Sequence, residues 1–90
     1  MNNMSNVIAE AENINKTKNE IYKLLEEDKL SLIYSKNFKD NDSDIFLEIY
    51  KCKACNKFFA LIEVEKKDKI KTNLKRLIYE IKMHLSKHNF

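Results

Sequence analysis

The 90-residue chain contains no glycine and no proline, and it has only two cysteines and two histidines. Without glycine it cannot form the glycine-rich loop that cradles phosphate in many nucleotide-binding proteins. It has no run of about 18 apolar residues, and its opening residues, MNNMSNVIAEAEN, lack the basic region and apolar core of a secretory signal. These absences predict an intracellular protein with no membrane partner, in the cytoplasm or nucleus, where thiols stay reduced.

Positive charge is concentrated in the second half of the chain. Residues 1–49 carry six lysines and ten acidic residues, a net charge of −4, whereas residues 50–90 carry eleven Lys or Arg and four acidic residues, a net charge of +7. This asymmetry is typical of a surface that faces a polyanion, although a solvated helix gives similar counts. The many residues with A/T-rich codons also indicate a low-GC microbe, a parasite or a virus as the source, which accounts for part of the lysine content.

Residues 5–28 have the apolar spacing of a helix. The spaced positions follow alternate steps of four and three and include one lysine: Val7, Ala11, Ile14, Lys18, Ile21 and Leu25. This spacing fits a heptad seam between two helices, but Ile8 and Leu24 widen the stripe into a face that could cover a sheet in the same chain. We favour packing within the chain.

Three strand-like segments follow, at residues 29–38, 45–51 and 58–65, and each is rich in β-branched or aromatic residues. The polar run KDNDSD is a turn between the first two, and CKACNK links the second to the third. The segments therefore predict a three-stranded antiparallel meander over residues 29–65.

From residue 66 to the end of the chain the apolar period becomes helical, through Ile70, Leu74, Leu77 and Ile81. The predicted fold is a single α+β domain over residues 1–90. A long C-terminal helix over residues 66–90 packs on the sheet.

The cysteines and histidines fall where this fold brings them together. Cys52 and Cys55 lie in the link between the second and third strands, and the helical series continues beyond Ile81 to His84 and His88 on adjacent turns. The third strand and the helix up to His84 would each span about 27 Å, so the helix ends near the point where the strand begins. Two thiolates and two imidazoles suit tetrahedral Zn²⁺ and leave no open position for a substrate.

Residues 50–88 share several features with one known family. These are Tyr50 two residues before the first cysteine, the Cys52-x₂-Cys55 pair, Lys57-Phe58, a leucine-bearing helix and His84-x₃-His88. This unit resembles a Cys₂His₂ zinc finger, with 28 residues between Cys55 and His84 where the common finger has about twelve. It is similar to the longer-spaced variants, including small single-finger proteins of viruses and mobile elements. The resemblance implies Zn²⁺ as cofactor and the metal ligands Cys52, Cys55, His84 and His88.

Other roles for the cysteines fit less well. A thioredoxin-like redox pair lies at a helix N-terminus, whereas Cys55 is followed by a strand-like segment. A c-type haem site requires histidine where the chain has Asn56. The third alternative is a coincidental arrangement of two cysteines and two histidines.

The sequence also argues against catalysis. With both histidines bound to a metal, no imidazole or thiol remains to activate a nucleophile. The acidic residues lie mostly in LLEEDK and KDNDSD, where no orienting partner is visible for a two-metal site. We therefore expect a protein that is not an enzyme and has no small-molecule substrate.

Binding is the remaining prediction, and it depends on the segment KKDKIKTNLKR (66–76), which has six cations and one anion. If Asp68 caps the helix, Lys69 and Lys71 oppose the helix dipole at a cost of a few tenths of a kcal/mol each. Phosphate contact would account for these lysines. The expected nucleic-acid contacts are Lys66, Lys67, Lys69, Lys71, Asn73, Lys75, Arg76 and Tyr79.

We therefore expect a regulator that binds nucleic acid, DNA in preference to RNA, through its C-terminal helix. The alternative is a protein-interaction or dimerisation module, such as a small viral adaptor or an inhibitor of a host protein. Such a module would use the N-terminal helix or the exposed pair Tyr79 and Met83.

Overall fold

The computed structural model of the protein describes the backbone of residues 3–88 and the side chains of residues 14–88. Along the sequence, one helix precedes and one follows four consecutive strands, in the order α1, β1, β2, β3, β4, α2. Their bounds are α1 Asn3–Glu26, β1 Leu30–Asp40, β2 Ser43–Cys52, β3 Phe58–Lys66, β4 Lys69–Thr72 and α2 Leu74–Leu85. Neither helix in the described part of the chain is long and apolar enough to cross a membrane.

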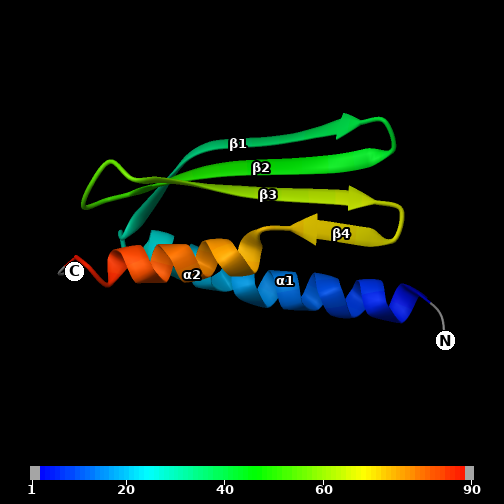
Figure 1. Cartoon of the computed structure of the whole chain (residues 1–90), viewed down its shortest axis with the longest axis horizontal. Coiled ribbons are helices and arrows are strands. Elements are labelled where there is room, and N and C mark those ends of the chain that lie inside the picture. The colour runs from blue at the N-terminus through cyan, green and yellow to red at the C-terminus, as the bar shows by residue number, and fades with distance from the viewer. Residues whose placement is uncertain (1–2, 89–90) are drawn as a thin grey trace.

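The strands form one antiparallel sheet in which neighbours in sequence are neighbours in space, β1-β2-β3-β4 (Figure 1). The turns are tight, and the chain has no glycine to adopt positive φ angles in them. Within residues 3–88, three residues adopt positive φ angles: Asp28 before β1, Asn41 between β1 and β2, and Lys67 between β3 and β4. Asp and Asn tolerate this conformation well, whereas at Lys67 the side chain opposes it.

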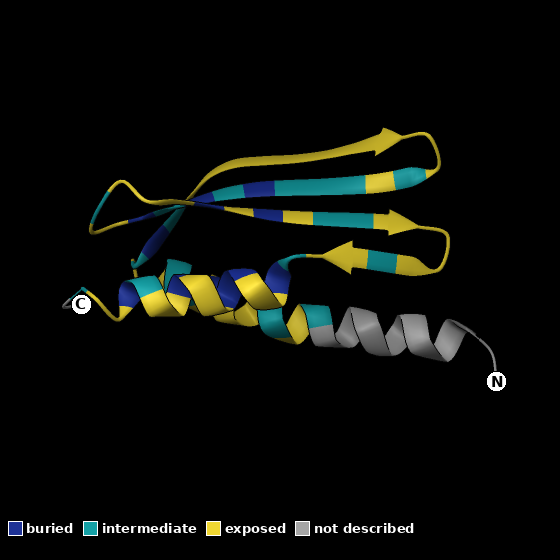
Figure 2. Ribbon diagram, in the orientation of Figure 1, coloured by how far each residue is buried: buried dark blue, intermediate teal, exposed yellow. Residues whose placement is uncertain are grey.

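The two helices lie together on one side of the sheet, and most of β1 is the part of the sheet farthest from them (Figure 1). Burial follows this arrangement, because β2, β3 and α2 carry most of the buried positions and β1 is exposed beyond its first residues (Figure 2). The buried core consists of Ile21, Leu30, Tyr50, Cys52, Phe59, Leu61, Leu74, Leu77, Ile78, Ile81 and Leu85. One core therefore joins α1, the sheet and α2.

Among the described side chains one carboxylate is buried, that of Glu48, on the same face of β2 as Tyr50. The Tyr50 hydroxyl donates a hydrogen bond to Glu48 Oε1. Burial, together with the Glu48 carboxylate, raises the pKa of Tyr50 well above its usual value. The hydroxyl therefore stays protonated and supplies the partner that a buried carboxylate needs.

Within the described side chains, α1 packs against its own chain. Ile21 is fully buried in the core, and Lys18 lies over the ring of Phe46, with Nζ 4.7 Å from the ring centroid. The Lys18 ammonium also contacts both carboxylate oxygens of Glu63 on β3, at 2.9 and 3.1 Å. The lysine that interrupts the apolar series is thus paired within the domain, which favours packing within the chain. Val7 and Ala11 of that series lie outside the residues whose side chains are described.

The C-terminal part of the fold differs from the prediction. The sheet has four strands instead of three, and α2 spans Leu74–Leu85 instead of residues 66–90. Residues 66–69 form the turn of a hairpin, so Asp68 is not a helix cap. The reason is that Lys-Ile-Lys-Thr also alternates with the period of a strand, and pairing with β3 (Glu63 opposite Thr72) satisfies its backbone groups.

The contact between Lys18 and Glu63 gives a test of how α1 is attached. Lys18→Met should destabilise the domain by about 2 kcal/mol, because it leaves the partly buried Glu63 carboxylate without its charged partner. We expect Lys18→Met combined with Glu63→Met to recover most of that loss, since no unpaired charge remains. Urea unfolding measures all three free energies of unfolding.

Lys16→Met is the matched control, because Lys16 is exposed on the same helix. It should leave the free energy of unfolding within about 0.5 kcal/mol of the parent. Equal losses for Lys16→Met and Lys18→Met would contradict the role given to the Lys18–Glu63 pair.

Candidate metal centre and basic surface

The two cysteines lie where β2 ends and the link to β3 begins. Cys52 is the last residue of β2 and is fully buried, and Cys55 lies in the following loop, partly buried. The Cys52 amide donates to the Lys57 carbonyl at 2.9 Å and closes this loop. The Lys53 amide donates to the Lys29 carbonyl at 3.0 Å, which ties the loop to the segment before β1. These backbone hydrogen bonds fix the end of β2 that carries Cys52 and the loop that carries Cys55.

The two histidines come from the end of α2. His84 is in the last turn of the helix, and His88 lies just past its end at Leu85. The prediction that both lie within one helix is therefore wrong for His88. Turn hydrogen bonds continue the chain in a nearly helical path, because the Lys87 amide donates to the His84 carbonyl and the His88 amide to the Leu85 carbonyl, each at 3.1 Å. This path keeps both imidazoles on the same side.

The four side chains meet at one end of the domain. One possible ligand atom from each of Cys52, Cys55, His84 and His88 lies within 4.8 Å of all the others. His84 Nε2 is 3.1 Å from Cys55 Sγ and 3.2 Å from His88 Nε2. A tetrahedral Zn²⁺ site has edges of about 3.4 Å between nitrogens and about 3.8 Å between sulfurs. The two His84 contacts are slightly shorter than such edges, and the other donor atoms lie within 4.8 Å, so the four residues are close enough to hold one metal ion.

The surroundings of His84 favour metal binding. Its ring lies edge-on to the buried Phe59 ring, with centroids 5.6 Å apart, and edge-on to His88 at 4.8 Å. Burial lowers the pKa of His84 below its usual value, and the charges of His88, Lys57 and Lys87 lower it further. The imidazole therefore remains neutral, and the neutral ring is the form that binds a metal ion.

The chain returns to the cysteines by a different route from the one predicted. β3 runs away from the cysteine loop, and β4 with α2 leads back. Four residues of β4 cover about 13 Å, and the ten steps from Leu74 to His84 along α2 cover about 15 Å, which together match the length of β3. The histidines still reach the cysteines, because a short strand followed by a short helix covers the same distance as the one long helix that the sequence predicted.

Comparison with known proteins gives no match, since no family profile, no curated protein and no solved structure matches the chain. The likeness to a Cys₂His₂ finger consists of the four convergent ligands and their spacing. These residues could hold a metal ion.

The predicted nucleic-acid contacts divide between a hairpin and a helix. Four lysines surround a shallow hollow of about 320 Å³ at the β3–β4 turn, with Asp68 and Val64: Lys66, Lys67, Lys69 and Lys71. Because Lys69 and Lys71 belong to β4 and not to a helix, their conflict with a helix dipole does not arise. The prediction that the C-terminal helix presents these lysines is wrong, although they do form one cationic surface.

The remaining predicted contacts belong to the start of α2. Lys75, Arg76 and Tyr79 are all exposed, and Arg76 forms an i,i+4 ion pair with Glu80 at 3.1 Å. Asn73 does not project toward a ligand. Its Oδ1 accepts from the Ile62 amide at 2.9 Å, and its Nδ2 donates to the Ala60 carbonyl at 2.8 Å. Both polar groups of the Asn73 side chain are therefore used in hydrogen bonds to β3, which attach the start of α2 to the sheet.

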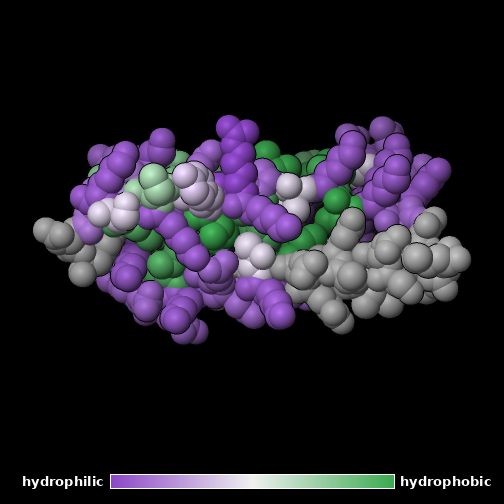
Figure 3. Space-filling view, turned by 60° about the horizontal axis from the view of Figure 1, so that its bottom comes forward, coloured by the Kyte–Doolittle hydropathy of each residue, from purple (hydrophilic) through white to green (hydrophobic). Residues whose placement is uncertain are grey.

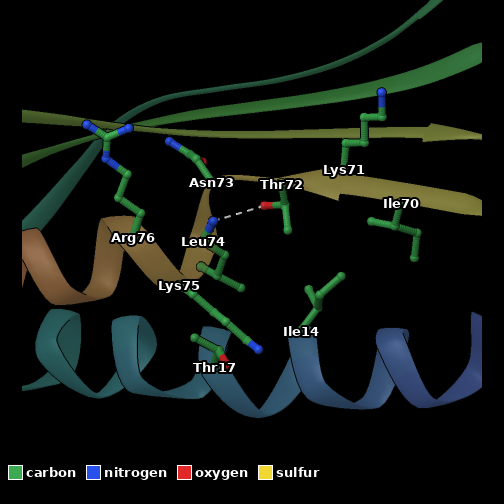
Figure 4. A pocket seen from close by; sticks show the side chains of 9 residues that line it. All are labelled: Ile14, Thr17, Ile70, Lys71, Thr72, Asn73, Leu74, Lys75 and Arg76. Atoms are coloured by element: carbon green, nitrogen blue, oxygen red, sulfur yellow. Dashed lines mark hydrogen bonds between the residues drawn. The ribbon is translucent and has the colours of Figure 1, made fainter.

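A second hollow, of about 530 Å³, lies between α1, β4 and the start of α2 (Figure 4). Ile14 and Ile70 face each other across it, while Lys75 and Arg76 stand at its margin (Figure 4). The space-filling view shows hydrophobic atoms in the hollowed middle of this side and hydrophilic side chains around them (Figure 3). Sequence reasoning missed this hollow, because it depends on β4 and its contact with α1.

The two hydrogen bonds of Asn73 can be tested one at a time. Asn73→Asp keeps the acceptor for the Ile62 amide but loses the donor to the Ala60 carbonyl, and Asn73→Ala loses both. We expect losses in the free energy of unfolding of about 1 kcal/mol for Asp and about 2 kcal/mol for Ala. Urea unfolding at neutral pH measures both, and two unchanged midpoints would show that Asn73 has no structural role.

Proposed function

We propose that the protein is a zinc-stabilised, nucleic-acid-binding regulator whose metal has a structural role. The observation that supports zinc is the convergence of two sulfur and two nitrogen donors within 4.8 Å. This donor set is typical of structural Zn²⁺ sites, in which four protein ligands leave no position for a substrate. The bound ion would link the β2–β3 loop to the end of α2, two segments that are far apart in sequence.

The proposal of a nucleic-acid partner rests on the cationic surface of residues 66–76. Its lysines surround one hollow at the β3–β4 turn, and Lys75 and Arg76 continue the positive charge onto α2. Concentrated charge of this kind attracts a phosphate backbone and contributes most of the affinity for nucleic acid. We favour DNA over RNA as the partner. The side chains that would contact its phosphate backbone are Lys66, Lys67, Lys69, Lys71, Lys75 and Arg76, with Tyr79 beside the backbone.

A second candidate function is supported by the outer face of α2. Tyr79 is 65% exposed and Met83, one turn later, is 50% exposed. Adjacent aromatic and thioether side chains are frequent anchors of protein interfaces. The alternative is therefore a zinc-stabilised protein-interaction module, such as an adaptor or an inhibitor, or a dimerisation module that uses this face.

The zinc proposal predicts one ion per chain and a fold that depends on it. Chelation at neutral pH should lower the melting temperature by tens of degrees or unfold the domain, because metal binding contributes directly to folding. Cys52→Ser and His84→Gln should be equally damaging. Elemental analysis and thermal unfolding, before and after chelation, provide the measurement.

Ala54→Ser serves as the control, because Ala54 is exposed in the same loop and the change retains all four ligands. It should keep the metal content and the melting temperature of the parent. Purified protein without stoichiometric metal, whose melting curve does not respond to chelation, would refute the zinc proposal.

The nucleic-acid proposal predicts a steep dependence of duplex affinity on salt. The log-log slope should be about −0.9 for each phosphate neutralised. Replacing Lys69, Lys71 and Lys75 by alanine together should reduce the slope by up to about three units. Fluorescence anisotropy with random-sequence duplex DNA, repeated over a range of salt concentrations, gives the slope.

The matched control replaces Lys16, Lys23 and Lys39, three exposed lysines outside the basic surface, and removes the same charge. This variant should keep most of the parent slope. A flat salt response in the parent would reject duplex DNA as the partner. Binding to a protein partner that is lost on Tyr79→Ala or Met83→Ala would then favour the alternative.

A further inference from the structure

No described helix or strand covers the side of the sheet away from α1 and α2, and we call this side the open sheet face. Paired residues of neighbouring strands project to the same side, and successive residues alternate. On β2, Glu48, Tyr50 and Cys52 are buried toward the helices, so Leu47, Ile49 and their partners project the other way. Figure 4 shows the same division on β4, where Ile70 points toward α1 and Lys71 points away.

Charge is sorted between the two sides of the sheet. The acidic residues of β2 and β3 all have the register of the helix side: Asp44, Glu48, Glu63 and Glu65. The lysines in register with the open sheet face are Lys36, Lys51, Lys66, Lys69 and Lys71. Two residues next to the β1–β2 turn are exceptions: Lys39 has the register of the helix side, and Asp40 has the register of the open sheet face. The open sheet face is therefore strongly positive.

Aromatic rings lie among these lysines. Tyr34 and Phe38 of β1 and Phe58 of β3 are in register with the open sheet face and are 45%, 40% and 55% exposed. Lys36 Nζ lies 5.3 Å from the centroid of the Phe38 ring, which confirms that the two side chains share this face. From strand spacings and register, Tyr34 is about 13 Å from Phe38 and about 12 Å from Phe58, whereas Phe38 and Phe58 are about 22 Å apart. They are separate exposed platforms and not one packed cluster.

The charge also bears on what could cover this face. If a second copy packed on it face to face, two sets of lysines would meet in a region that also buries apolar side chains. Like charges brought together under such burial are destabilising. A partner of opposite charge avoids this cost, and one that also carries planar rings would use the aromatic platforms.

We propose that the open sheet face binds single-stranded nucleic acid, with Tyr34, Phe38 and Phe58 stacking on bases and Lys36, Lys51 and Lys71 contacting phosphates. A duplex keeps its bases stacked inside, whereas a single strand presents them to aromatic side chains. This inference rests on the proposed nucleic-acid function and names a preferred form of nucleic acid. It also gives a role to the apolar residues between the rings, such as Leu47 and Ile62, on which sugars and base edges can lie.

The test compares three probes with the metal-loaded full chain. They are a labelled oligothymidylate of about 12 nucleotides, a duplex of the same length, and heparin, which has negative charge but no bases. We expect the single strand to bind at least about tenfold more tightly than the duplex at moderate salt. Phe58→Leu and Phe38→Leu should each weaken single-strand binding by about tenfold and leave heparin binding unchanged.

Tyrosine emission supplies a second readout that does not depend on stability. The chain has no tryptophan, so stacking on Tyr34 should quench tyrosine fluorescence when the oligonucleotide binds. Tyr34→Phe should keep the affinity and lose most of the quench. Tyr22→Phe is the matched control on α1, with Tyr22 46% exposed, and it should keep both. Circular dichroism of each variant confirms that it is folded.

The outcomes separate this inference from the function on which it rests. Equal binding of single strand, duplex and heparin, without effect of the aromatic variants, would overturn the stacking role and leave nucleic-acid binding in place. Failure of all three probes to bind would overturn both. A parent that dimerises on a sizing column, with Phe58→Leu monomeric, would instead identify the open sheet face as a contact between copies.

Discussion

The return of His84 and His88 to the cysteine loop is the constraint on which the rest of the structure depends. Cys55 and His84 are 29 positions apart in sequence, yet their donor atoms are 3.1 Å apart. Everything between them must form a closed path, so the length of β3 has to equal the combined reach of β4 and α2. The same path places Phe59, Leu61, Leu77 and Ile81 in one core. The Cys/His cluster and the core are therefore two results of one closure.

This closure separates the candidate metal centre from the basic residues of the chain. The C-terminal end of α2 is at the candidate metal centre, and its N-terminal end at Leu74 is about 15 Å away. The cationic residues of the hairpin and of the start of α2 lie at that distant end. A metal at this site would stabilise the scaffold while contact with a polyanion takes place elsewhere, which agrees with the structural role proposed for zinc.

The helix side of the sheet also shapes the opposite side. Three of its four carboxylates have partners there: Glu48 accepts from Tyr50, Glu63 contacts Lys18, and Asp44 lies 3.9 Å from Lys39. Strand lysines project mainly to the other side, where no helix covers them. Pairing the acidic groups on the helix side thus leaves the positive charge of the strands concentrated on the open sheet face. The two faces of one sheet acquire opposite electrical character from alternation alone.

The sequence by itself determined the elements with strong local patterns. These were the first helix, the three long strands and the Cys-Cys and His-His pairs, because each depends on periodicity or spacing within a few residues. The tertiary structure decided the segment Lys69–Thr72, whose four residues fit a strand or a helix until pairing with β3 selects the strand. The tertiary structure also gave Asn73 two backbone hydrogen-bond partners on β3, which no local sequence pattern predicts. Which face of the sheet stays uncovered was likewise decided only by packing, since alternation separates two faces without saying which one the helices will cover.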